Sequence, residues 1–183
     1  MNPSIIIDSR MTFEEAISGT TAPRDVIDTL CLIDVRYQAF DGLLHQGQLV
    51  IHKAIISDVL AIFRMIEVSG FPVAKVLPII KYVWSDDRSM ADNNSSAFNY
   101  RVVLGTDRLS RHAFGKAVDI NPLLNPVMYD NGLISPDGAV YNTEKPGTLF
   151  ETHPIVREFL RCGWQWGGHF TDFKDYHHFD KPE

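Results

Sequence analysis

Two separated segments of the sequence carry side chains that could hold a metal ion and activate water. One contains His112 and Asp119, and the other, near the carboxyl terminus, contains Asp175 and His178. A catalytic zinc site uses three protein ligands of the His, Asp or Glu type and leaves a fourth position open. A further carboxylate can then accept a proton from water. This set predicts a catalytic zinc site in which the two histidines and Asp119 are ligands and Asp175 is the general base.

The spacing within each segment decides which local structure could bring these groups together. His112 and Asp119 would lie about 10 Å apart on a helix, too far to share one metal ion. Gly115 and the β-branched residues that follow it instead predict a loop that runs into a strand. On a strand, residues three apart point to opposite faces, so Asp175 and His178 require a bulge or tight turn. Taken singly, each pair is also typical of a capping aspartate or a solvated acidic loop.

The two segments together resemble a known family. The pattern Ser-x-His-x-x-Gly-x-Ala-x-Asp at residues 110–119, followed by acid-x-x-His at residues 175–178, is similar to that of the zinc D-alanyl-D-alanine peptidases. This family includes bacterial D,D-carboxypeptidases, the dipeptidases of vancomycin resistance and phage L-alanyl-D-glutamate endolysins, and it shares its core with Hedgehog signalling domains. Further similar stretches lie at residues 94–101, 108–115, 119–126, 163–168 and 178–180. The resemblance runs from Asp34 to the end of the chain.

The resemblance implies the same three zinc ligands and the same base, and it adds two substrate-binding residues. Arg101 falls where the family places an arginine near the scissile carbonyl or the substrate carboxylate. A guanidinium suits that task because it is always charged and offers paired donors; a surface salt bridge is the alternative. Ser110 matches the family serine that lines the substrate site, although a plain turn hydroxyl is nearly as compatible with the sequence.

Two positions depart from the family pattern. The family base is commonly glutamate, whereas Asp175 is one methylene shorter and requires a closer backbone. His177 beside His178 leaves the second imidazole ligand ambiguous. The three-residue spacing from the acid favours His178, and alternation places His177 on the other face. His177 then either hydrogen-bonds the substrate or fills an aromatic wall, and His169 is expected to be structural.

Composition excludes several other classes of protein. With 45% hydrophobic and 22% charged residues, the chain is a typical soluble globular protein. Its net charge of −6 argues against a nucleic-acid-binding protein. No apolar run reaches the ~18 residues of a membrane span, and the start lacks the pattern of a signal peptide. Whether one was removed stays open, as does the oligomeric state. Cys31 and Cys162 are expected to be buried free thiols, with a disulfide as the alternative.

The chain of 183 residues is most simply one domain, with residues 1–33 as an extension or cap. We expect an α+β fold, in which a central antiparallel sheet has helices on one face and the metal lies in an open cleft across the sheet. The predicted elements are a helix at 12–18, a hairpin of strands 30–37 and 47–52, a helix at 53–69, a strand at 72–83, a polar loop at 85–96, an irregular excursion at 121–148, a helix at 152–162 and strand-like structure at 164–179.

The aromatic residues near the carboxyl terminus have two interpretations. They form either a platform for a glycan or peptide, or packing of the core and cleft wall. These residues are Trp164, Trp166, Phe170 and Phe173. Between them, Gly167 and Gly168 permit a tight bend through which the catalytic segment returns to the metal.

The sequence therefore predicts a zinc-dependent peptidase that hydrolyses peptidoglycan stem peptides, similar to a D-alanyl-D-alanine carboxypeptidase. An L-alanyl-D-glutamate endopeptidase and a non-catalytic, Hedgehog-like metal-bearing binding module are the alternatives. The acid three residues before His178 argues against the binding module, because a binder needs no base. We expect one Zn²⁺ per chain, a stem peptide or muropeptide as partner, and action in the periplasm or cell wall.

Overall fold

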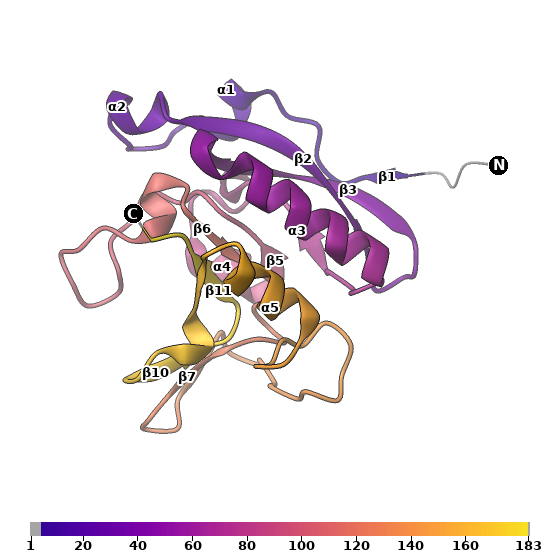
Figure 1. Cartoon of the computed structure of the whole chain (residues 1–183). Coiled ribbons are helices and arrows are strands. Elements are labelled where there is room, and N and C mark those ends of the chain that lie inside the picture. Colours follow the sequence, from indigo (N-terminus) through magenta and orange to yellow (C-terminus); the bar gives the residue numbers. More distant parts are fainter. Residues whose placement is uncertain (1–4, 183) are drawn as a thin grey trace.

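The computed structural model describes residues 5–182 and is built around a long β-hairpin (Figure 1). Strands β2 (Leu30–Gln38) and β3 (Leu44–His52) pair antiparallel along their whole length. The short strand β1 (Ile6–Ile7) adds to β3 in parallel. The predicted hairpin is confirmed, although its second strand begins three residues earlier than expected. Because β2 spans residue 33, the expected boundary between extension and domain falls inside a strand.

Helix α3 (Ile56–Ser69) packs against the hairpin and confirms the predicted helix, whose first residues form a 3-10 turn at Lys53–Ile55. Apolar residues at i, i+3, i+4 and i+7 form one stripe along the helix. The buried residues of this stripe are Val59, Ile62, Phe63 and Ile66. The helix ends at Gly70, whose left-handed backbone (φ 67°) allows its N–H to bond to Glu67 and Ile66.

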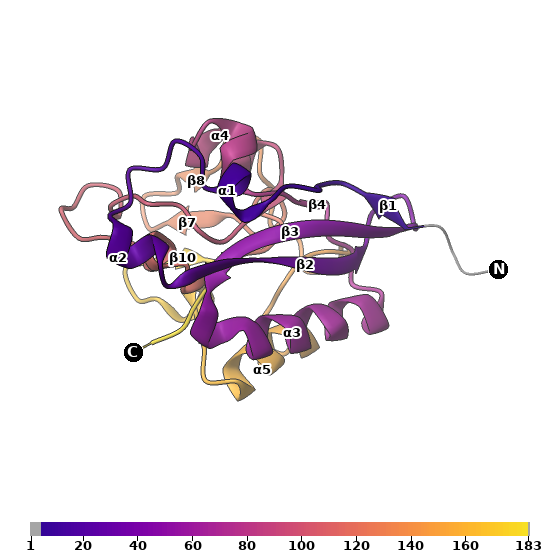
Figure 2. The same ribbon diagram turned by 90° about the horizontal axis from the view of Figure 1, so that it is seen from above.

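Both faces of the hairpin are covered. Leu49 and Ile51 belong to the large core shared with α3 and α5 (Pro154–Arg161), whereas Val50 belongs to a smaller cluster on the other face. Figure 2 shows α3 and α5 on one side of the hairpin, and α1 (Phe13–Ala16) and α4 (Asp86–Ala91) on the other. The expected placement of the helices on one face only is therefore wrong.

The rest of the chain contributes short strands. They are β4 (Lys75–Val76), β5 (Asn94–Ser95), β6 (Ala117–Asp119), β7 (Val127–Tyr129), β8 (Ile134–Ser135), β9 (Gln165–Trp166), β10 (Phe173–Asp175) and β11 (His178–Asp180). Their sheets have the orders β4-β5, β6-β11-β9 and β10-β7-β8. The α+β class is confirmed, but the strands of residues 5–182 form four small sheets in place of one central sheet.

Two predicted elements are wrong. The strand expected at 72–83 is reduced to β4 and a 3-10 turn at Ile79–Tyr82, because prolines at positions 72 and 78 remove backbone donors. The loop expected at 85–96 contains α4, since the Ser85 hydroxyl caps this helix by accepting the N–H of Arg88 at 3.3 Å. Polar composition there reflects capping of a helix and not a solvated loop.

The predicted ends of two helices agree with the structure. Helix α1 begins with the expected capping box between Thr12 and Glu15, and α5 is followed by Gly163 in a left-handed conformation. A short helix, α2 (Arg24–Ile27), was not expected. The cysteines are free thiols, as expected, but they are partly exposed and not buried. Among the residues that the structure describes, no helix has the length and apolarity that crossing a membrane would require.

Candidate metal centre and pocket

His112 lies in a single 3-10 turn, Arg111–Phe114, that leads into β6. The Ser110 hydroxyl caps this turn by accepting the N–H of His112 at 3.3 Å. The turn ends at Gly115, which has a φ of 63° and whose Cβ, if present, would lie 2.8 Å from the backbone nitrogen of His52. Both the left-handed backbone and the close approach require glycine at this position. The predicted loop-to-strand geometry is confirmed.

Asp119 lies between two neighbouring backbone segments that fix its position. On one side, its N–H donates to Ser96 O at 2.8 Å and its own carbonyl accepts from Ser96 N at 3.1 Å. On the other side, β6 pairs antiparallel with β11, and Asp119 lies directly opposite His178. Side chains of directly opposed residues share one face of a sheet. The cross-strand register thus places the aspartate and the histidine together.

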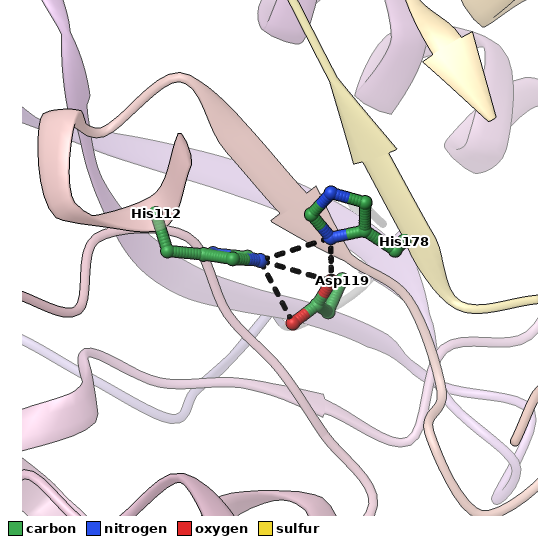
Figure 3. A group of neighbouring side chains, drawn as sticks. All are labelled: His112, Asp119 and His178. Atoms are coloured by element: carbon green, nitrogen blue, oxygen red, sulfur yellow. Dashed lines mark hydrogen bonds and ion pairs between the residues drawn. The ribbon is translucent and has the colours of Figure 1, made fainter. Parts of the chain in front are cut away.

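The side chains of His112, Asp119 and His178 converge on one point (Figure 3). The Nε2 atom of His112 lies 3.1 Å from His178 Nδ1 and 3.1 Å from the nearer carboxylate oxygen of Asp119. His178 Nδ1 lies 3.1 Å from Asp119 Oδ1. Ligands of a tetrahedral zinc ion with bonds of ~2.0–2.1 Å would be about 3.3 Å apart. The observed spacing is close to that value.

Hydrogen bonds to the outer nitrogens fix the orientation of each histidine ring. His112 Nδ1 bonds to the carbonyl of Ala97, and His178 Nε2 lies 3.2 Å from Asp180 Oδ2. Because these partners only accept, the outer nitrogens carry protons. The inner nitrogens face the Asp119 carboxylate, and on releasing their own protons they would offer lone pairs to a metal ion. These residues fit a metal ion.

Asp180 was not singled out from the sequence as a site residue. It is buried, and its carboxylate supplies the outer partner that metal-bound histidines usually have. The sequence pattern that could have identified Asp180 is its spacing from His178, because residues two apart on a strand point to the same face.

The electrostatics of the group favour positive charge at its centre. Burial would raise the pKa of Asp119, but the charges of His112 and His177 and its hydrogen bonds to the two neighbouring imidazoles hold that pKa well below its usual value. Burial would lower the pKa of His178, but hydrogen bonds to Asp119 and Asp180 raise it to about 10. Asp119 therefore stays ionised, and the site attracts a proton or a metal cation.

A pocket of about 700 Å³ opens onto this group. Such a volume is typical of a small-ligand site. Besides the three convergent side chains, its lining includes every other residue that the sequence predicted for the site: Arg101, Ser110, Asp175 and His177. The structure thus brings all of the predicted site residues to one pocket, while their individual roles stay predictions.

Asp175 ends strand β10 and is largely buried, with 16% of its side chain exposed. Its segment is packed tightly, since a Cβ at Gly167 would lie 2.8 Å from Asp175 Cβ. Glycine is needed there for the close approach, as the predicted bend required. Asp175 Oδ1 lies 3.1 Å from His177 Nε2 but has no hydrogen-bond partner within residues 5–182. The two atoms are therefore close enough for an ion pair, but they are not aligned for a hydrogen bond.

His177 lies outside the convergent group. Its ring is buried, and its Nδ1 donates to the backbone carbonyl of Asn125 at 2.7 Å. The ring is therefore held from one side and faces Asp175 on the other. The structure places His178, and not His177, beside Asp119.

Arg101 and Ser110 are neighbours through their backbones, because Ser110 N donates to Arg101 O at 3.0 Å. The hydroxyl of Ser110 caps the turn of His112, so the turn interpretation of this serine is correct, and the residue also lines the pocket. The Arg101 guanidinium pairs with Asp86 at 2.8 Å. Arg101 therefore forms the salt bridge that was the alternative interpretation, and it also lines the pocket as the resemblance implied.

The aromatic residues near the carboxyl terminus divide between the two interpretations. Trp164 and Trp166 are buried in the core, whereas Phe170 and Phe173 line the pocket. His169 is exposed at the pocket edge and pairs with Glu151 at 2.7 Å.

The comparison with protein families identifies this segment. Residues 104–181, 78 of the 183 in the chain, match the family model described as D-alanyl-D-alanine carboxypeptidase. The match includes the three convergent residues and Asp175, whereas Arg101 lies just before it. No curated protein and no solved structure matched the chain. Residues 104–181 are thus similar to a D-alanyl-D-alanine carboxypeptidase family, and the predicted resemblance to these peptidases is confirmed for that segment.

Proposed function

We propose that the protein is a zinc-dependent peptidase that hydrolyses peptidoglycan stem peptides in the manner of a D-alanyl-D-alanine carboxypeptidase. The observation that carries this proposal is the convergence of two imidazole nitrogens and a carboxylate, about 3.1 Å apart, in a pocket that also contains a separate acid. A binding module would need the ligands but not the acid.

His112 Nε2, His178 Nδ1 and the Asp119 carboxylate would hold one Zn²⁺. Imidazole and carboxylate donors in a group of three suit zinc with an open coordination position. When bound there, Zn²⁺ polarises a carbonyl and lowers the pKa of a coordinated water toward ~7. The outer hydrogen bonds to Ala97 and Asp180 would orient the rings so that the inner nitrogens face the ion.

Asp175 would be the general base. It would take a proton from the attacking water and later pass it to the departing amine. Its Oδ1, which has no hydrogen-bond partner among residues 5–182, is free to accept that proton. The close packing of its strand against Gly167 supports a base that is one methylene shorter than glutamate, because the backbone approaches closely there.

Three further residues would contact the substrate. Arg101 would stabilise the developing oxyanion or anchor a carboxylate. Ser110 and His177, both on the pocket wall, would bind the peptide through their side chains. Arg108 and Arg111 line the same pocket. These two additional arginines in the wall support carboxypeptidase activity, because the terminal carboxylate of a stem peptide needs cationic partners.

The proposal extends to location and organisation. Peptidoglycan lies outside the cytoplasm, so the enzyme would act in the periplasm or cell wall. The residues before Asp34 would be a cap on a single peptidase domain. Their described part is consistent with this, since β1 pairs with β3 and α1 packs beside β2.

Digestion of purified muropeptides, with products identified by mass spectrometry, tests the function directly. Loss of a terminal D-alanine supports the carboxypeptidase, and cleavage between L-alanine and D-glutamate would assign the endopeptidase instead. Protein purified without chelator should contain about one equivalent of zinc, and chelation should abolish activity. Zinc binding without cleavage of any stem peptide would identify a binding module. Protein without metal, whose activity is insensitive to chelator, would exclude the mechanism.

A further inference from the structure

Asp86 pairs with Arg101, a residue of the pocket lining, although it belongs to a segment distant in sequence from the metal group. It is the first residue of α4, directly after the capping Ser85. Its Oδ2 lies 2.8 Å from Arg101 Nη2, and its Oδ1 accepts from Asn99 Nδ2 at 3.3 Å. Asn99 is buried, and its N–H donates to His112 O at 3.1 Å. The carboxylate is therefore held by a buried neighbour that also contacts the turn of the metal group.

One nitrogen of the Arg101 guanidinium forms an ion pair, whereas another has no hydrogen-bond partner among the described residues. Nη2 pairs with Asp86, and Nη1 makes a long contact of 3.5 Å to the carbonyl of Val102. Nε is buried and has no hydrogen-bond partner within residues 5–182. A buried donor without a partner costs free energy unless an acceptor reaches it. An oxygen of a bound peptide would supply that acceptor.

We propose that Asp86 is a positioning residue that holds Arg101 in the pocket wall for the reaction. This inference rests on the proposed function of Arg101. The carboxylate restricts the guanidinium to one orientation and offsets its charge. Arg101 then acts as an oriented donor to the oxygen that becomes negative in the transition state, and less as a cation that captures anionic peptides. Losing Asp86 should consequently lower kcat while leaving KM unchanged or lower.

Asp87 provides a matched control. It follows Asp86 in the first turn of α4, but it is exposed. Asp86→Asn and Asp87→Asn remove the same charge from the same helix start, so any general effect on the helix is shared. On a stem peptide, we expect Asp86→Asn to lower kcat by about tenfold or more without raising KM, and Asp87→Asn to leave both unchanged. Equal kinetics of the two variants would overturn the proposal.

A second pair of variants keeps the charge and so tests geometry alone. Asp86→Glu moves the carboxylate by one methylene, whereas Asp87→Glu makes the same change on the exposed face. The first should have a lower kcat than the wild type without a higher KM, and the second should match the wild type. This comparison decides the question even where Asp86→Asn fails to fold, because equal kinetics of the two glutamate variants would overturn the proposal.

The Nε–H signal of Arg101 in a ¹⁵N correlation spectrum gives a readout that needs no activity. In the wild type, burial should make exchange of this proton with water slow. Asp86→Asn should broaden the signal or speed its exchange, and Asp87→Asn should not. An unchanged signal in Asp86→Asn overturns the positioning role. If the wild type cleaves no stem peptide, the proposed function fails, and this spectrum still decides whether Asp86 fixes Arg101.

Discussion

The hairpin with α3 and the region around the pocket are built in opposite ways. The first consists of two nine-residue strands and a fourteen-residue helix that follow one another in sequence. The second, from Asn94 to Asp180, contains within the described chain no strand longer than three residues. Both halves bury apolar side chains in the large core, but the irregular half has few ladder hydrogen bonds and relies in addition on polar contacts between distant segments.

Two buried asparagines show how the irregular half is held. Asn121 Oδ1 accepts from Ala74 N, and its Nδ2 donates to the carbonyls of Pro72 and Gly147. Asn125 Oδ1 accepts from Leu149 N, and its Nδ2 donates to three carbonyls. These amides satisfy backbone groups that a regular sheet would otherwise pair. Placing a metal group and a base in short segments thus depends on buried hydrogen bonds more than on sheet length.

The comparison predicts that changes in the irregular half remove function and leave the fold intact. The largest effect should come from His178→Ala, which removes a proposed ligand and should abolish zinc binding. His177→Ala is the neighbouring control, because His177 bonds to Asn125 and lies outside the metal group. It should retain zinc and lose substrate affinity. Metal analysis of both purified variants decides between the histidines, and the reverse pattern would overturn the assignment.

The same contrast explains what could be predicted from the sequence. The hairpin and α3 were predictable because their periodicity is local, and Gly70 marks the end of the helix. Residue types suggested the metal group, but the resemblance was needed to favour it over a capping aspartate or an acidic loop, since its geometry depends on the register between β6 and β11. Asp180 and Asp86 were missed because each contacts another side chain, His178 or Arg101. For Asp180 the spacing from His178 was an available signal, whereas no local pattern records the contact between Asp86 and Arg101.

Asp175→Asn should have the second largest effect. It removes the proton acceptor at nearly constant shape, and general-base contributions are typically ~10²–10⁴ in rate. We expect the variant to keep its zinc and to lose at least about a hundredfold in kcat on a muropeptide. Asp175→Glu should be partly active if the extra methylene can be accommodated. Loss of zinc from Asp175→Asn would make the residue a ligand, and full activity would exclude it as the base.

Ile62→Ala tests the regular half. Ile62 lies on the buried face of α3, in the large core. Its truncation should lower the free energy of unfolding by about 2–5 kcal/mol, since transfer and cavity costs add. Zinc affinity of the folded protein should be unchanged, because Ile62 is not one of the residues that line the pocket. Urea unfolding gives the first quantity and a competitive chelator the second. A parallel fall in zinc affinity would show that the two halves are coupled.

Asp180→Asn addresses the link between the fold and the metal group. The amide keeps the shape but presents a weaker acceptor to His178 Nε2, or a donor if it rotates. Changes to such outer partners typically reduce metal affinity ~10–100-fold. We therefore expect weaker zinc binding by about that factor with little change in stability. Unaltered affinity would mean that the contact between Asp180 and His178 is incidental.

The smallest effect should come from two histidines outside the pocket, whose pH dependences have opposite signs. Burial would lower the pKa of His45, but hydrogen bonds to Asp8 and Asp41 raise it overall. Burial lowers the pKa of His153, whose Nδ1 accepts the N–H of Ile155 at the start of α5. A raised pKa contributes stability below the unfolded value of ~6.5 and loses it as pH rises through the folded value. A lowered pKa contributes stability above ~6.5 and loses it as pH falls through the folded value.

His45→Gln should therefore destabilise the protein more at about pH 6 than at about pH 9. His153→Gln should do the reverse, with a smaller loss at low pH. Each difference should be below ~1 kcal/mol, because ion pairs and caps near the surface contribute little. Urea titrations of the wild type and both variants give the free energy of unfolding at the two pH values. Subtracting the wild-type value at each pH removes the contribution of groups that titrate in all three proteins. If the loss of stability in the two variants changed with pH in the same direction, the stabilisation of a charged His45 by Asp8 and Asp41 would be contradicted.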